Sequence, residues 1–321
     1  MALATLPDVT VPEALTPHRP HLERLLAQAR AKGPIGVAVA YPCDASALQA
    51  AVQAAEAGLI KPLLVGPRER IEAAAQSAGL DLLGTQIHHT ADDARQAASQ
   101  AAALCRDGQA MALRKGSRHS DDRLAAAVAR EAGLRTDRRA SHVFVMDVPA
   151  YDRPLLMTDC VVNIFPALLD KRDIAQNAIN LAHSIGIARP RVAILSAVET
   201  VNPAIPGTVD AAALCKMADR GQITGGILDG PLAYDNAISL SSATNKGIVS
   251  DVAGSPDVLL VPSLEAGNMI YKQLVYMANA ECAGLVLGMR VPIVLTSRSD
   301  SIASRIASCA LAVLASAGMQ A

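Results

Sequence analysis

Hydrophobic positions in the first third of the chain form short apolar runs that alternate with amphipathic, Ala-rich stretches. Ile35–Ala40 is an apolar run of strand length, and Ala45–Ala57 follows it with helical periodicity. The same order returns at Pro62–Val65 and Arg68–Ala78, where Gly79 marks a helix end. This alternation predicts an α/β fold with a parallel sheet and helices on both faces. The other elements predicted for this third are His21–Lys32, Ile87–His89, Ala91–Cys105, Ala110–Leu113 and Asp121–Ala132.

The pattern changes near Arg135–Arg139. His142–Val148 and Leu155–Thr158 are apolar runs on either side of the turn-rich Ala150–Pro154, which predicts a pair of antiparallel strands. Alternation then resumes, so we expect a domain boundary at the change. The later predicted elements are Lys171–Ile185, Val192–Ser196, Val209–Arg220, Ile227–Asp229, Val258–Val261, Asn268–Ala278, Gly284–Leu287, Pro292–Leu295 and Ser301–Ala317.

Length and composition narrow the class of protein. A chain of 321 residues is long for one core and favours two domains. Hydrophobic residues make up 51% and mean hydropathy is +0.26, so material for buried cores is ample. Aromatic residues make up 2% and the net charge is −1, which argues against nucleic-acid binding. We count no apolar run of the roughly 20 residues that a membrane helix needs, and expect no membrane partner.

The cysteines and the first residues indicate the compartment. The six cysteines are scattered, form no CxxC pair and have no His at zinc spacing, which predicts reduced thiols and no metal site. The first 20 residues are broken by Pro and lack the basic start and apolar core of a signal peptide. We therefore expect a cytoplasmic protein.

Three blocks in the last third share one arrangement: an apolar run, a turn rich in Gly, Pro, Asn, Asp or Ser, and a helical pattern. The blocks are Leu228–Ala237, Leu259–Leu274 and Pro292–Ser301. Ligands of open α/β sheets bind where strands end and helices begin. The third block places Ser297 and Arg298 at such a point, and Arg holds phosphate with two parallel hydrogen bonds. The three strand ends therefore predict an enzyme site for a ligand that contains phosphate.

A second candidate site is the turn between Ala110–Leu113 and the next predicted helix. Lys115 and Gly116 open this turn, and His119 and Ser120 close it. Gly allows close backbone approach, and a helix start offers free N–H groups to an anion. An ordinary turn with solvated charges explains the same residues equally well.

Other polar residues at strand ends are weaker candidates. Asp235 is at least as well explained as a helix cap, and Asp159 as a buried, hydrogen-bonded carboxylate. Asn268, in the segment that begins at Glu265, could order a loop or contact a ligand. Lys272 could neutralise a phosphate or pair with Glu265. No GxGxxG or GxxxxGK[ST] motif occurs, so dinucleotide and P-loop sites have no motif support.

Several blocks of the chain resemble the phosphate acetyltransferase/phosphate butyryltransferase family. They read LDGPLAYDNAIS, SLEAGNMIYKQLVYMANAECAGLVLGMRVPIVLTSRSDS and GLRTDRRASHVFVMDVPAYDRPLLMTD. The likeness runs from about residue 35 to the end. LTSRSDS and the Lys115–Gly116 turn are similar to the butyryltransferase branch. Val192–Gly230 is similar to the phosphate acetyltransferase module that elsewhere follows an enoyl-CoA hydratase domain.

The resemblance implies a fold and a reaction. Members catalyse acyl-CoA + phosphate ⇌ acyl phosphate + CoA and need no cofactor, because coenzyme A is a substrate. The implied fold is the two-domain, three-layer phosphotransacetylase fold, which is like that of isocitrate and isopropylmalate dehydrogenases. Residues 1–136 and 285–321 would form a discontinuous first domain, and residues 137–284 an inserted second domain. The implied active site lies in the cleft between the domains, and the implied assembly is a homodimer.

The resemblance also assigns roles to residues. Ser297 and Arg298 match the family's Ser-Arg pair, which binds the phosphoryl group and the polarised carbonyl. His119-Ser120 matches a phosphate-contacting turn. The chain departs from the acetyltransferase pattern at Ala125, where those enzymes have Arg, and at Ser304, where they have the Asp proposed as general base. Asp300 is the nearest carboxylate to that position.

Alternative functions remain open from the sequence. A phosphate butyryltransferase would differ only in its acyl pocket. A relative of oxidoreductases is a second alternative, because family resemblance extends to the C-terminal part of malic enzymes. A non-catalytic module that binds acyl-CoA or acyl phosphate is a third, motivated by Ala125 and Ser304.

Overall fold

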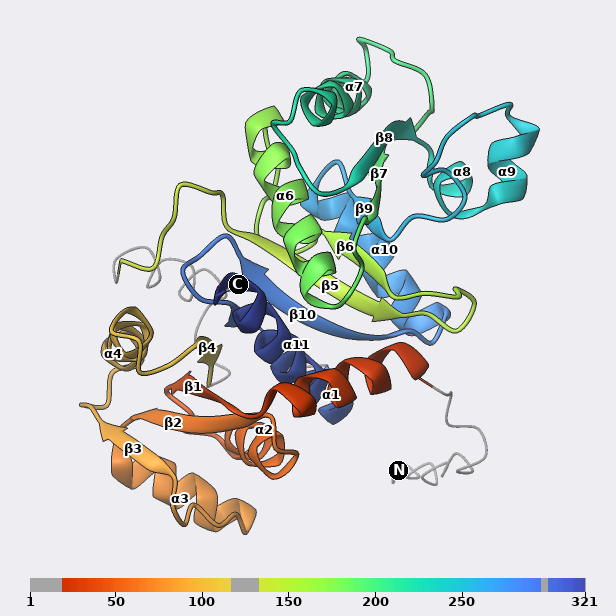
Figure 1. The fold of residues 1–321 in the computed structure, drawn as a ribbon. Coiled ribbons are helices and arrows are strands. Elements are labelled where there is room, and N and C mark those ends of the chain that lie inside the picture. Colours follow the sequence, from red (N-terminus) through yellow and green to blue (C-terminus); the bar gives the residue numbers. More distant parts are fainter. Residues whose placement is uncertain (1–18, 117–132, 296–299, 321) are drawn as a thin grey trace, which may run out of the picture.

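The computed structural model describes residues 19–116, 133–295 and 300–320, and their strands form one 11-stranded sheet (Figure 1). The strand order is β3-β2-β1-β4-β11-β10-β5-β6-β9-β7-β8. The strands are β1 Ile35–Ala40, β2 Ile60–Gly66, β3 Gln86–His89, β4 Ala112–Lys115, β5 Ser141–Asp147, β6 Leu155–Thr158, β7 Arg191–Leu195, β8 Ile227–Leu232, β9 Val258–Leu260, β10 Glu281–Leu287 and β11 Ile293–Val294. The helices are α1 Pro20–Lys32, α2 Ala45–Glu56, α3 Arg68–Ala78, α4 Ala94–Arg106, α6 Leu168–Ser184, α7 Pro206–Asp219, α8 Tyr234–Ile238, α9 Leu240–Asn245, α10 Leu264–Met277 and α11 Ile302–Gln320.

The direction of the strands reverses in the middle of the sheet. β1, β2, β3, β4 and β11 are mutually parallel, and β11 pairs antiparallel with β10. β10 pairs antiparallel with β5, and β5 antiparallel with β6, which confirms the predicted antiparallel pair. β6, β9, β7 and β8 are again parallel to one another. They therefore run opposite to β4 and β11, and their carboxyl ends lie at the other edge of the sheet.

Helices cover both faces of the sheet, as predicted. The larger core joins one face of the strands to α1, α2, α3, α6, α7 and α11. On the opposite face, α4 packs over β1, β2 and β4, and α8, α9 and α10 pack over the second half of the sheet. Figure 1 shows α1 and α11 crossing the middle of the sheet on the first face and α10 behind it. The sheet is thus the middle layer of three.

Local sequence signals account for several helix ends. The carboxylate of Asp44 caps α2 by accepting from Ala47 N at 2.9 Å, and Ser263 caps α10 through Ala266 N. α3 ends at Gly79, which adopts a left-handed conformation with φ of 63°. The predicted helix Asp121–Ala132 lies outside the described residues.

The last helix is the most apolar of the long helices that the structure describes. Its window Ile302–Met319 has a hydropathy of 1.6 and is long and apolar enough to cross a membrane, by length and composition only. In the structure, 61% of that window is buried, and α11 packs on α1, α6 and β10. A central core helix passes the same test, and the packing identifies α11 as one.

Candidate active site

The end of β4 brings Gly116 into close contact with the end of β1. Gly116 N donates to Ala40 O at 2.8 Å. A Cβ at Gly116 would lie 2.2 Å from Ala40 O and 2.7 Å from Tyr41 O, distances that real Cβ atoms do not reach. Glycine is therefore required here by backbone packing, in addition to any role beside a ligand. Lys115 is half-buried at the same strand end.

The residues before α11 converge on Glu281 at the start of β10. Ser301 Oγ donates to Glu281 Oε1 at 2.6 Å, and the buried Ser304 hydroxyl donates to the same oxygen. Ser304, which the sequence marked as a departure from the acetyltransferase pattern, thus lies against a carboxylate. Sequence reasoning did not find Glu281, because it lies 20 residues before Ser301 and a strand intervenes.

Asp300 lies beside a small aromatic cluster. Tyr271, on α10, stacks on Phe144 with ring centroids 4.0 Å apart, and His142 meets Phe144 edge-on at 4.3 Å. Burial is the main cause of a raised pKa at Tyr271, and the charge of Asp300 raises that pKa further. Burial, and then Asp300, likewise raise the pKa of the Cys282 thiol to about 12. Asp300 is therefore in electrostatic reach of α10 and β10.

Gly284 makes room for this cluster. A Cβ at Gly284 would lie 2.8 Å from the imidazole of His142. The buried imidazole and the Phe144–Tyr271 stack thus depend on a glycine in β10. The sequence offered no signal for the cluster, because His142 and Phe144 lie on β5 and Tyr271 lies far along the chain on α10.

Asn268 and Lys272 lie one turn apart on α10. Asn268 Nδ2 donates to Cys160 O at 3.3 Å, which ties α10 to the segment after β6. Lys272 is exposed on α10. Among the described residues no hydrogen bond or ion pair joins Lys272 to Glu265, Asp300 or Lys115. The predicted structural pair Lys272–Glu265 does not form.

The structure does not bring the three predicted strand ends together. β11 ends at one edge of the sheet, whereas β8 and β9 run antiparallel to it and end at the other. The carboxyl ends of the three strands therefore do not meet, because β5 and β10 reverse the direction of the sheet between them. The second and third blocks still approach one another through α10, since Asp300 acts on Tyr271. Of the predicted site residues, Lys115 ends β4, Gly116 follows it, and Asp300 lies between β11 and α11. Ser297, Arg298, His119 and Ser120 lie outside the described residues.

Two carboxylates of the weaker candidate turns have structural partners. Asp159 is buried and accepts from Val161 N, Val162 N and the Asn163 side chain, which confirms the structural interpretation. Asp235 does not cap a helix: it accepts from Ser242 Oγ at 2.6 Å and pairs with Lys246. Among the residues that the structure describes, no group of three or more His, Cys, Asp or Glu side chains could hold a metal ion.

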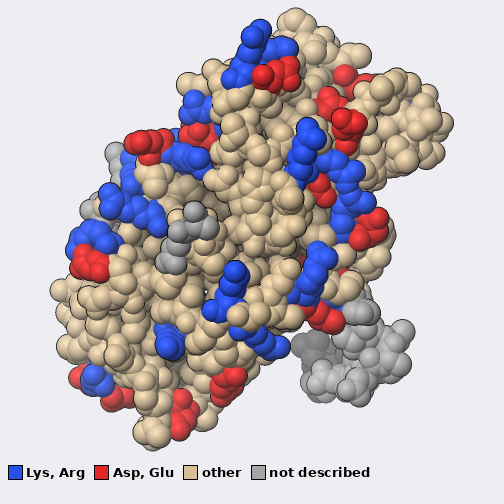
Figure 2. All heavy atoms as spheres, in the orientation of Figure 1, with Lys and Arg blue, Asp and Glu red and all other residues tan. Residues whose placement is uncertain are grey.

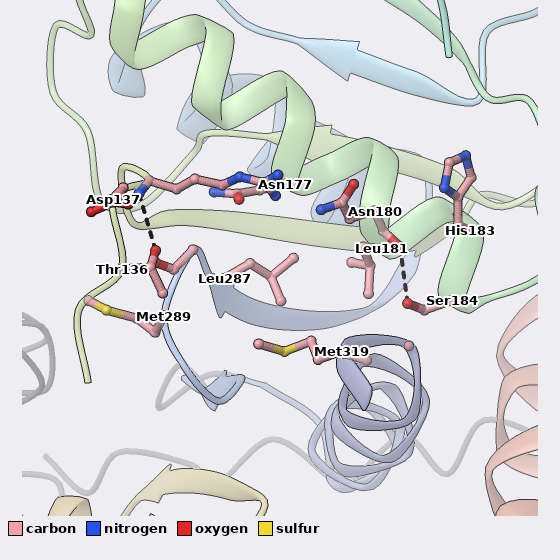
Figure 3. Close-up of a pocket in the computed structure, with 14 residues that line it drawn as sticks. Thr136, Asp137, Asn177, Asn180, Leu181, His183, Ser184, Leu287, Met289 and Met319 are labelled. Carbon is pink, nitrogen blue, oxygen red and sulfur yellow. Dashed lines mark hydrogen bonds between the residues drawn. The ribbon is translucent and has the colours of Figure 1, made fainter. Parts of the chain in front are cut away.

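A cavity of about 750 Å³ lies at the far end of α11 from Asp300 (Figure 3). It is lined by α6, by the last turn of α11 and by two connecting segments, Thr136–Arg138 and Leu287–Met289. α11 has 19 residues and is therefore about 28 Å long. The cavity, here called the α6–α11 cavity, is thus separate from the predicted active site.

Comparison with known proteins decides the family. The model of the family described as phosphate acetyl/butaryl transferase matches residues 83–313. The chain belongs to the phosphate acetyltransferase/phosphate butyryltransferase family. Among relatives, it is 55% identical over 292 residues to the phosphate acetyltransferase of Rhizobium meliloti, covering 91% of this chain and 92% of that protein.

A second relative and a solved structure extend the comparison. The phosphate butyryltransferase of Clostridium beijerinckii is 42% identical over 281 residues, covering 88% of this chain and 93% of that protein. The crystal structure of a branched-chain phosphotransacylase from Enterococcus faecalis V583 superimposes with a TM-score of 0.76 at 28% identity, covering 88% and 99% of the two chains. Family and fold therefore agree along most of the chain, as the resemblance implied.

Proposed function

We propose that the protein is a phosphate acetyltransferase, which converts acetyl-CoA and phosphate reversibly into acetyl phosphate and CoA. The observation that carries the proposal is the 55% identity to a phosphate acetyltransferase over 91% of the chain. The phosphate butyryltransferase of Clostridium beijerinckii is more distant, at 42% identity. The reaction is an acyl transfer between two substrates and calls for no cofactor.

The proposed mechanism is direct transfer in a ternary complex. A phosphate oxygen attacks the thioester carbonyl, a tetrahedral oxyanion forms, and the C–S bond breaks as the C–O bond is kept. The CoA thiolate leaves and takes up a proton; the reverse reaction begins with loss of that thiol proton. The protein accelerates this reaction by holding two anions together and by stabilising the oxyanion.

Roles follow for the predicted residues. Ser297 and Arg298 bind the phosphoryl group and the polarised carbonyl, and Lys115, Gly116, His119 and Ser120 form the phosphate-binding turn. Asp300 is the proposed acceptor of the thiol proton. Two observations support the arrangement. The phosphate-binding turn follows β4 and α11 follows β11, and these two strands are parallel neighbours in the sheet. Asp300 is also in electrostatic reach of Tyr271 on α10.

Asn268 and Lys272 would contribute from α10. Asn268 helps to fix the first turns of the helix through Cys160 O. The ammonium group of Lys272 is exposed and would meet a phosphate of CoA at the surface. This part of the proposal is separable, because Lys272→Ala should raise KM for acyl-CoA and leave kcat nearly unchanged.

The first experiment is to measure phosphate-dependent CoA release from acetyl-, propionyl- and butyryl-CoA with a thiol reagent. A clear preference for acetyl-CoA supports the proposal. A preference for butyryl-CoA would move the protein to the other branch, since one methylene in an apolar pocket discriminates by about 1–3 kcal/mol. No release from any of the three would leave a binding module and contradict the proposed activity.

Arg298 provides the test of the site. Arg298→Ala should lower kcat/KM by about 10²–10³, as loss of a preorganised donor to an oxyanion does. Arg24→Gln is the matched control, because Arg24 is exposed on α1. Near-normal turnover in Arg298→Ala, with the control unchanged, would remove Arg298 from the mechanism.

We further propose the assembly, the domains and the compartment that the family implies. Met269, Tyr276 and Met277 leave apolar surface exposed on α10, which supports a homodimer through this helix. The change of strand direction at β10 and β5 fits a second domain inserted at residues 137–284. Six free cysteines fit a reducing cytoplasm. Light scattering of Tyr276→Arg tests the dimer, which this substitution should split.

A further inference from the structure

The α6–α11 cavity has an apolar floor and a polar rim. Leu181, Leu287, Met289 and Ala315 are buried and form the floor. Figure 3 shows Leu181 pointing down from α6 and Leu287 pointing up from β10, with Met319 from α11 facing them. Enclosure by hydrocarbon with a few polar groups at the edge is the usual build of a small-molecule site.

Most polar groups of the rim are already engaged with protein atoms. Asn177 Nδ2 donates to Arg139 O and to Ser141 Oγ, both at 2.9 Å. The Thr136 hydroxyl donates to Gly288 O at 2.7 Å, and the Ser184 hydroxyl donates to Asn180 O at 3.0 Å. These groups shape the rim and have few donors left for a ligand.

Asp137 and Arg138 are the two residues of the rim with Asp, Glu, Lys or Arg side chains, and of these Arg138 is the one that can hold an anion. With the Asn180 amide oriented so that its hydrogen bonds are satisfied, Asn180 O accepts from one guanidinium nitrogen of Arg138 at 2.6 Å. Among the described residues Arg138 makes no ion pair with a carboxylate, while its neighbour Arg139 pairs with Asp170. A guanidinium has five N–H donors, so most of them remain for an anion, and Asn180 holds the side chain in place.

The cavity lies beside the two segments that connect the halves of the sheet. Thr136–Arg138 leads into β5, and Leu287–Met289 leads from β10 toward β11. These are the two segments that connect the parallel strands around β4 with the reversed half of the sheet. Gly288, with φ of 80°, packs 2.5 Å from Arg139 O at its missing Cβ, so the two segments are in close contact. A molecule in the cavity would touch both.

We propose that the α6–α11 cavity binds a small organic anion, a carboxylate attached to an apolar body. The carboxylate lies on the Arg138 guanidinium, and the hydrocarbon lies on Leu181, Leu287, Met289 and Met319. The site is distinct from the proposed acyl-transfer site at Asp300, because the two lie at opposite ends of α11. The inference goes beyond the proposed function and does not depend on it.

Calorimetric titration of the full chain with hexanoate and with hexanamide tests the proposal without any measurement of turnover. Hexanoate should bind, and the uncharged hexanamide should bind at least tenfold more weakly. Arg138→Gln should weaken hexanoate about ten- to a hundredfold, as loss of a charged hydrogen-bond donor does. Arg138→Lys keeps the positive charge but loses the two parallel N–H donors. Its affinity for hexanoate should lie between those of the unchanged protein and Arg138→Gln.

Two further variants locate the ligand. Arg24→Gln removes an exposed Arg from α1 and should leave hexanoate binding within twofold. Met319→Ala removes part of the apolar wall and should weaken hexanoate about three- to tenfold. Arg138 is exposed, so its variants should keep the unfolding temperature of the unchanged protein. No binding of hexanoate, or equal affinity in Arg138→Gln, would overturn the assignment; equal affinity in Met319→Ala would overturn the apolar half of it.

Discussion

At the scale of single residues, the predicted phosphate turn depends on the absence of a side chain. Gly116 hydrogen-bonds to Ala40 O, and a Cβ there would meet the backbone of both Ala40 and Tyr41. Backbone cannot yield as a flexible side chain can. The end of β4 can therefore approach β1 this closely only with glycine at position 116.

Gly116→Ala should destabilise the fold by about 1–3 kcal/mol, the usual cost of an extra methyl group forced into a packed site. It should also lower the rate of acyl transfer, because the adjacent Lys115 belongs to the proposed phosphate-binding turn. Urea unfolding and the CoA-release assay measure the two effects. Gly207→Ala is the control: its Cβ would make ordinary contacts, the nearest 3.4 Å from Ser196 Oγ, and its stability should be unchanged or higher. Equal behaviour of the two variants would contradict the close approach at Gly116.

Glu281 carries a second prediction at this scale. Glu281→Ala removes the acceptor of two serine hydroxyls, and the buried Ser304 hydroxyl would keep only the Cys282 sulfur, at 3.8 Å, as a neighbour. The cost should be about 1–3 kcal/mol in the free energy of unfolding. Glu281→Gln retains an acceptor and should cost less. Glu56→Ala, at an exposed helix end, should cost nothing, and a loss as large as that of Glu281→Ala would point to a general charge effect instead.

The residues of the site show how far sequence reasoning reaches. Lys115, Gly116 and Asp300 could be named as candidates because strand, turn and helix signals are local and place polar residues at strand ends; their roles stay predictions. Glu281, His142 and Arg138 were missed because their importance comes from partners on other elements. Spacing along the chain carries no signal for a carboxylate beside Ser304 or for a spare guanidinium beside Asn180.

At the scale of elements, α6 and α7 are joined by an ion pair that is mostly removed from water. Lys171 Nζ lies 2.7 Å from Asp210 Oδ2, and the side chains are 7% and 26% exposed. By contrast, the pair Lys216–Asp219 within α7 is 67% and 62% exposed. A pair held away from water is strongly destabilised when only one partner is removed.

Lys171→Ala should therefore lower the free energy of unfolding by about 2 kcal/mol, since Asp210 would lose its partner but keep some contact with water. Lys171→Met, which retains the packing of the stem, should separate the loss of charge from the loss of contact. Lys216→Ala should leave the urea midpoint nearly unchanged, because exposed pairs contribute little. Similar midpoints for Lys171→Ala and Lys216→Ala would show that burial does not strengthen the α6–α7 pair.

Elements were predicted better than their arrangement. Periodicity located β1, β2, α2 and α3 within a few residues, and it recognised β5 and β6 as an antiparallel pair. It did not show that β10 and β5 turn the second half of the sheet around, because strand direction depends on which strands pair. Pairing partners far apart in sequence, such as β4 with β11, leave no local pattern.

At the scale of the whole molecule, both signs of charge are mixed on the visible face (Figure 2) and most of the thiols are buried. Figure 2 shows Lys and Arg interspersed with Asp and Glu over the visible face, in keeping with the net charge of −1. Burial raises the pKa of Cys43 to about 11 and the pKa values of Cys105, Cys215 and Cys282 to about 12, from an ordinary value of 9.0. At pH values between about 9 and these raised pKa values, the four thiols therefore stay protonated in the folded protein and ionise in the unfolded chain.

The sign of the resulting pH dependence is set by those raised values. Each thiol contributes its full stability below about pH 9, and the contribution is lost as the pH rises toward about 12, because only the unfolded chain ionises in between. Cys105→Ala removes one such thiol. Above pH 9 the free energy of unfolding should then fall less steeply with pH, by about 1.4 kcal/mol per pH unit. Urea unfolding of both proteins at pH 7, 9.5 and 10.5 measures the difference. Parallel curves would show that Cys105 ionises alike in both states.

The place of β11 has a consequence for how the protein is made. β11 lies between β4 and β10, so two residues near the end of the chain close the middle of the sheet. The ribosome makes β11 long after β1 to β4, so one edge of β4 stays unpaired in between. Such an edge invites pairing with other chains. Completion of the sheet therefore waits for β11, and a chain that stops before residue 293 should aggregate rather than form a smaller folded unit.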